Sequence, residues 1–147
     1  MKKAFIALVS CMFLLCGCSY EKYDIGTDMV VSYYTIEPAQ WVKENTGVGY
    51  QYYCTIRNKD INKDVIEDGA VLAYYIDPET GLDHLLQYSF PVRIGRTTEK
   101  TTQNIRFEVK RGEITFVIEW ADGVAYDIED PYEFKVCVMA PGERIRN

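Results

Sequence analysis

The stretch Asn104–Glu119, NIRFEVKRGEITFVIE, contains the strongest folding signal in the chain. Apolar and polar residues alternate on both sides of Arg111-Gly112, which is typical of two strands joined by a two-residue loop with glycine where a positive φ is needed. Pairing outward from this loop places Lys110 opposite Glu113 and brings three apolar pairs onto one face, namely Val109–Ile114, Phe107–Phe116 and Ile105–Ile118. Because a slip of one residue would break every pair, the alternation predicts a hairpin with a well-defined register.

Further short strands are expected on both sides of this hairpin. Their predicted ranges are 29–36, 48–57, 70–76, 82–90 and 132–139. The range 70–76 is almost continuously apolar, which is typical of a buried central strand. The near-helical spacing of apolar residues over 60–68 predicts one helical turn that Gly69 can end. These elements predict an all-β fold, a single antiparallel β-sandwich of the immunoglobulin-like or a related type with one short helical turn.

The first residues have the organisation of a bacterial export signal. Lys2 and Lys3 precede an apolar run over 4–15, which is too short to cross a bilayer because a spanning helix needs about 20 apolar residues. The run ends in Leu15-Cys16-Gly17-Cys18, which resembles the lipobox of bacterial lipoproteins. This resemblance implies cleavage before Cys18, acylation of that cysteine with chains such as palmitate, and anchoring in a Gram-negative envelope. The expected location is the outer membrane, facing the periplasm or the cell exterior. An ordinary secretory signal or a buried helix is the alternative.

These signals divide the chain into a signal peptide at 1–17, a tether at 18–28 and a β-sandwich domain at 29–147. The tether is expected because residues 19–28 are polar and lack periodicity. The signal peptide contains two lysines and no acid, so its removal leaves 130 residues with a formal net charge of −8 in place of −6. That length is typical of one domain. No nucleic-acid partner is expected for so acidic a domain, because phosphates require basic surfaces.

Besides Cys18, two cysteines belong to the predicted domain, Cys54 and Cys137. An even pair in an exported protein favours a disulfide. Strand alternation favours separate thiols, because Cys54 shares the apolar face of its strand whereas Cys137 shares the opposite face with Lys135. Cysteines on such faces do not readily bring their Cβ atoms to bonding distance. We therefore expect two separate thiols, with the disulfide as the alternative.

From Trp41 onward, the order of sequence signals resembles a set of small Bacteroidetes envelope proteins with no assigned activity. The matching segments are Trp41, the strand 50–56, INKDVIEDGAVLAYY, LLQYSF, the hairpin 104–120 and the closing YEFKVCVMAPG. The chain departs from the pattern of these proteins at two places. Ile61-Asn62 stands where they usually have Ile-Thr, and the segment LLQY lacks their proline. The resemblance implies a β-sandwich envelope lipoprotein, and it carries over no catalytic residue.

An acidic stretch, Glu119–Glu133, contains six acids and no base. Calcium prefers several oxygen ligands at close range, so this stretch supplies a candidate calcium site formed by Asp122, Asp127, Glu129 and Asp130. The spacing is not that of an EF-hand, and a solvated acidic loop is the alternative.

Exposed aromatic residues are candidates for a binding surface, because they bring a large contact area at low entropic cost. Trp41 and Tyr53 are the candidates here, together with either Tyr74 or Tyr75 on an outward strand position, and a sugar ring or a partner protein is the expected ligand. Trp120 is expected in the core, because it lies in phase with the apolar residues of the hairpin.

His84, the only histidine, is next to Asp83, but the chain has no G-x-S-x-G or other nucleophile motif. We therefore expect a turn-capping or solvent-facing histidine and a non-enzymatic, lipid-anchored module that binds a protein or glycan without a cofactor. Two alternatives stay open, a small envelope hydrolase or inhibitor and a structural subunit that assembles through a strand edge. A binding module requires a contiguous exposed aromatic patch, whereas an enzyme requires a cleft with a perturbed carboxylate or His84.

Overall fold

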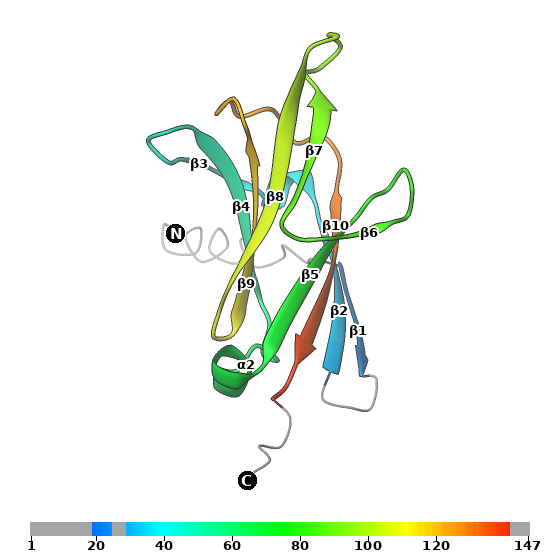
Figure 1. Cartoon of the computed structure of the whole chain (residues 1–147), viewed down its shortest axis with the longest axis vertical. Coiled ribbons are helices and arrows are strands. Elements are labelled where there is room, and N and C mark those ends of the chain that lie inside the picture. The colour runs from blue at the N-terminus through cyan, green and yellow to red at the C-terminus, as the bar shows by residue number, and fades with distance from the viewer. Residues whose placement is uncertain (1–18, 25–28, 142–147) are drawn as a thin grey trace, which may run out of the picture.

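The structure is a computed structural model that describes residues 19–24 and 29–141. Two five-stranded antiparallel sheets pack against each other in the described part of the chain, as Figure 1 shows. The predicted antiparallel β-sandwich is therefore confirmed, although with more strands than the sequence pattern indicated. No helix in these two ranges is long and apolar enough to cross a membrane. The predicted signal peptide and Cys18 lie outside the described residues, so the lipobox stays a prediction.

The first sheet, sheet A, has the strand order β1-β2-β10-β5-β6. Its strands are β1 (Ser19–Asp24), β2 (Met29–Ile36), β10 (Tyr132–Met139), β5 (Ala70–Ile76) and β6 (Asp83–Leu85). The sequence predicts a tether over 18–28, but residues 19–24 instead form an edge strand, which pairs with β2 from Ser19–Thr35 to Asp24–Val30. Pairing at a sheet edge uses backbone groups, so a polar segment without clear alternation can still join the sheet.

The second sheet, sheet B, has the order β3-β4-β9-β8-β7. Its strands are β3 (Val42–Asn45), β4 (Tyr50–Arg57), β9 (Glu113–Trp120), β8 (Lys100–Lys110) and β7 (Tyr88–Arg93). The β8–β9 hairpin has the predicted register throughout. Gly112 has a φ of 79°, and Lys110 Nζ lies 2.8 Å from Glu113 Oε2 across the turn. The most local signal in the sequence was therefore also the most accurate.

The predicted helical turn is α2 (Lys63–Asp68), which lies at the lower end of the sandwich in Figure 1. The Asn62 side chain begins it by accepting a hydrogen bond of 3.0 Å from the Val65 N–H. Gly69 ends it, and its N–H bonds the Val65 carbonyl at 3.0 Å. Ile61 and Val65 are buried and attach the turn to the core.

The core lies between the sheets, where Phe116 of β9 and Phe134 of β10 stack with ring centroids 4.0 Å apart. Both rings are fully buried, and inward isoleucines and valines surround them. The prediction that 70–76 is a buried central strand is correct in position, since β5 lies between β10 and β6, but wrong in burial, because Ala73 is the only buried residue of β5 and Leu72 is 36% exposed. Sheet A covers the core with one face only, so alternate residues of β5 point outward.

Cys54 and Cys137 are both buried and are not joined in a disulfide. Cys54 belongs to β4 of sheet B and is paired with Phe116, whereas Cys137 belongs to β10 of sheet A and is paired with Leu72. The expectation of separate thiols is confirmed. Burial raises the pKa of the Cys137 thiol, so this side chain is neutral at physiological pH.

Candidate functional site

Trp41 does not lie on a binding surface, contrary to the prediction. Its side chain is only 7% exposed and packs edge-on against Tyr132 and Phe134, with ring centroids 5.7 and 6.4 Å apart. The 3-10 turn η1 (Pro38–Gln40) leads from β2 of sheet A to β3 of sheet B, and Trp41 directly follows it. The residue is therefore enclosed where the chain crosses between the sheets.

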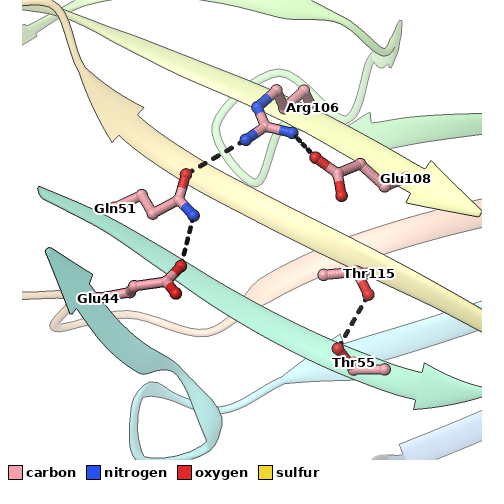
Figure 2. Close-up of polar contacts among 6 residues, drawn as sticks. All are labelled: Glu44, Gln51, Thr55, Arg106, Glu108 and Thr115. Carbon is pink, nitrogen blue, oxygen red and sulfur yellow. Dashed lines mark hydrogen bonds and ion pairs between the residues drawn. The ribbon is translucent and has the colours of Figure 1, made fainter. Parts of the chain in front are cut away.

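Tyr53 lies on the outer face of sheet B, as predicted, but no ring of the described residues stacks with it there. It is half-buried and paired with Val117, which is buried although it points outward. Figure 2 shows the polar contacts on this face. Gln51 donates to Glu44 at 2.7 Å and accepts from Arg106 at 3.2 Å, and Arg106 also bonds Glu108. These polar groups satisfy one another within the sheet.

The predicted calcium ligands Asp122, Asp127, Glu129 and Asp130 are not gathered into a cation site. Among the residues that the structure describes, no group of three or more His, Cys, Asp or Glu side chains is placed to hold a metal. The Asp122 carboxylate instead accepts hydrogen bonds from the Val124 N–H at 3.0 Å and the Tyr126 hydroxyl at 2.8 Å. Burial raises the pKa of Asp122, but these hydrogen bonds outweigh that effect and lower its pKa.

His84 takes part in a ring stack and not in a dyad with Asp83. Its ring lies parallel to that of Tyr88, with centroids 4.1 Å apart at 8°, and its Nε2 is 3.8 Å from an Asp77 carboxylate oxygen. The Asp83 carboxylate is bound by Lys135 on the outer face of sheet A. The same lysine lies 4.3 Å from the centroid of the Tyr74 ring, which is thus the outward one of the two adjacent tyrosines.

A groove of about 930 Å³ opens at the end of the sandwich where β5 ends and β10 begins. It is lined by residues of β5, β7 and β8, by the last residue of β9 and the first of β10, by the turn after β5 and by the segment that leads into β10. Its aromatic residues are Tyr75, Tyr88, Phe90, Trp120, Tyr126 and Tyr132. The volume is in the range of ordinary ligand sites, about 300–1,000 Å³.

The aromatic lining is held in place by ring contacts and one buried amide. Tyr75 of β5 lies parallel to Phe90 of β7, with centroids 5.9 Å apart at 5°, so rings of both sheets contact each other across the groove. Gln103 is only 4% exposed, and its amide donates to the Tyr132 hydroxyl at 2.9 Å. Trp120 is in the core, as predicted, yet one part of it also reaches the groove. The lining is therefore largely preformed.

The charged residues of the groove are mostly acidic. Five carboxylates line it, Asp77, Glu79, Asp127, Glu129 and Asp130, against one cation, Arg93. Hydrogen bonds from the Glu79 N–H and the Thr80 hydroxyl lower the pKa of Asp77, which is therefore charged at neutral pH.

Burial raises the pKa of Tyr75 and of Tyr132, so these two groove tyrosines are neutral at physiological pH. The groove thus combines uncharged ring surfaces with negative charge and offers stacking, hydrogen bonding and attraction for a cation.

The groove has a restricted set of reactive side chains. The residues that line it include no serine, cysteine, histidine or lysine. Asp77 is not suited to be the general acid of a glycosidase, because that role requires a raised pKa and the pKa of Asp77 is lowered. The arrangement is suited to binding.

Sequence reasoning missed this groove, although alternation alone places Tyr88 and Phe90 on one face of their strand. What the pattern does not show is that these inward positions stay partly open. The opening arises because β5 ends at Ile76 and β10 begins only at Tyr132, so the irregular segment 121–131 faces this part of sheet B in place of a strand.

No protein-family model matches the chain, and neither a curated protein nor a solved structure matches it.

Proposed function

We propose that the protein is a lipid-anchored lipoprotein of a Gram-negative envelope and a non-enzymatic binding module, whose ligand, a protein or a glycan, occupies the aromatic groove. The observation that carries the proposal is the groove itself. Six aromatic residues line a preformed cleft that is large enough for a ligand and contains no serine, cysteine, histidine or lysine. Aromatic rings in such clefts supply much contact area at low entropic cost.

The anchor part of the proposal rests on Leu15-Cys16-Gly17-Cys18. Several acyl chains on one cysteine hold a protein durably, because each buried methylene contributes about 0.8 kcal/mol. The substitution Cys18→Ala is expected to release the protein from membranes and to abolish labelling by a clickable palmitate analogue. Unchanged retention of this variant in the membrane fraction would overturn the anchor.

The binding part is tested with a photoreactive amino acid at single positions in living cells. Glu79 and Glu129 line the groove, whereas Glu44 and Thr55 lie on the outer face of sheet B shown in Figure 2 and serve as matched controls. Crosslinked adducts are expected from the two groove positions and not from the controls, and Tyr88→Ala is expected to remove them.

The same adducts from both faces, or none from the groove, would contradict the proposal. Circular dichroism of the Tyr88→Ala variant separates loss of binding from loss of folding.

A further inference from the structure

We infer that the groove binds a basic segment of a partner protein, with lysine or arginine side chains lying against its rings. This inference rests on the proposed function and specifies its ligand. It starts from the charge of the lining, where five carboxylates face one arginine. A neutral sugar would leave this excess of negative charge uncompensated, whereas a cation is attracted both by carboxylates and by ring faces.

The groove carboxylates are available to a ligand, because the lysines and arginines of the described residues do not pair with them. Elsewhere in the described residues, acids such as Glu67, Glu113 and Asp83 have a lysine partner on the same chain. No described lysine or arginine is within ion-pair distance of Glu79 or of the three acids in 127–130. Among the described residues, the one basic side chain near Asp77 is His84, whose Nε2 lies 3.8 Å from its carboxylate.

The distribution of charge favours a chain with several cations over a single one. All five carboxylates lie in two short segments at the end of sheet A, residues 77–79 after β5 and 127–130 before β10. A groove of about 930 Å³ is also much larger than one lysine side chain requires. An extended segment with neighbouring basic residues can place one cation near each acidic segment.

Strand addition is not the expected mode of binding. The groove adjoins β7, an edge strand of sheet B, but Pro91 in its middle has no N–H to give to an added strand. Recognition then depends on side chains that enter the groove, where rings and carboxylates meet them.

The test measures binding of capped tetralysine to the purified full-length protein in neutral detergent by calorimetry. Three other probes are compared with it: the same peptide with all lysines acetylated, spermine, and a neutral tetrasaccharide. Tetralysine is expected to bind at least tenfold more tightly than each of the three, with an affinity that falls as salt is raised.

Two triple variants separate the groove from general acidity. Neutralising Asp127, Glu129 and Asp130 as Asn, Gln and Asn is expected to weaken tetralysine binding about tenfold. The matched control neutralises three acids of α2, far from the groove, as Asp64→Asn, Glu67→Gln and Asp68→Asn, and its affinity is expected to stay within about twofold of the unmodified protein.

Equal effects of the two triple variants would overturn the inference, as would acetylated peptide binding as tightly as tetralysine. Spermine binding as tightly as tetralysine would assign the site to small polyamines, and tighter binding of the tetrasaccharide would assign it to glycans. Either result overturns the basic segment while the crosslinks from Glu79 and Glu129 still support a groove ligand. Absence of those crosslinks would instead overturn the proposed function.

Discussion

Gly69, at the end of α2, is predicted to tolerate no side chain, and the substitution Gly69→Ala tests this. A Cβ atom built on Gly69 would lie 2.4 Å from the Met139 carbonyl oxygen and 2.8 Å from Val65 Cα, whereas ordinary van der Waals contact begins at 3.4 Å. Both neighbours are backbone atoms, so no change of rotamer relieves the overlap. Either α2 or the end of β10 must move.

Overpacking of this kind costs about 1–3 kcal/mol, and we expect the upper end, because two backbone segments are involved. A loss of about 3 kcal/mol is a large part of the 5–15 kcal/mol that stabilises an ordinary domain, and it lowers the melting temperature by about 10 °C. Urea unfolding followed by circular dichroism measures the free energy directly.

The matched control is Gly47→Ala, the same substitution where no atom lies within 4 Å but φ is +85°. There only backbone strain opposes alanine, at about 1–2 kcal/mol. If Gly69→Ala is no more destabilising than Gly47→Ala, the close approach of the Met139 and Val65 backbone does not exclude a side chain at Gly69. Since α2 is far from the groove, folded Gly69→Ala protein should also bind tetralysine with unchanged affinity.

Three further predictions concern charge and thiol chemistry. Lys135→Met should cost about 1 kcal/mol in urea unfolding, because it removes the bond to Asp83 and a cation–π contact. That bond raises the pKa of Lys135, so its contribution to the free energy of unfolding is complete below the unfolded pKa near 10.5 and is lost as the pH rises through the folded value. Lys135→Met should lack this alkaline loss of stability, and a loss as large as in the unmodified protein would contradict the prediction. The pKa of Asp122 is lowered, so its contribution to the free energy of unfolding is present above about pH 4 and is lost as the pH falls through the folded value. The stability of Asp122→Asn should therefore fall less between neutral and acid pH than that of the unmodified protein. In denaturant without reductant, an alkylating reagent should modify both Cys54 and Cys137, as measured by mass spectrometry. If neither were modified, the two cysteines would be joined in a disulfide, which would contradict their placement in separate sheets.

Sequence predicted the hairpin correctly because its determinants are local. Register there depends on a two-residue loop and on alternation that continues for several pairs, and Gly112 supplies the only unusual φ. The end of α2 was equally readable, since Gly69 was expected to end the turn, whereas its start at Lys63 lies three residues after the predicted one.

Other features depend on partners distant in sequence. Residues 19–24 become a strand because β2 offers a free edge, which their own composition does not show. Trp41 is buried because Tyr132, 91 positions later, returns next to it, and no pattern around Trp41 indicates this. The groove likewise depends on where strands of two sheets end relative to each other.

The strand β1 relates the two proposals to each other. Ser19, the residue after the predicted lipid attachment site, is paired with Thr35, and Thr35 is paired with Glu133, which is paired with Ile76. This row crosses sheet A at the end where the groove opens, because Tyr132 and Asp77, next to Glu133 and Ile76, both line it. With Ser19 already in the sheet, a lipid on the preceding residue would leave almost no slack between bilayer and domain. The proposed anchor would then hold the groove close to the membrane, so its partner segment should be sought among chains that approach the same bilayer surface.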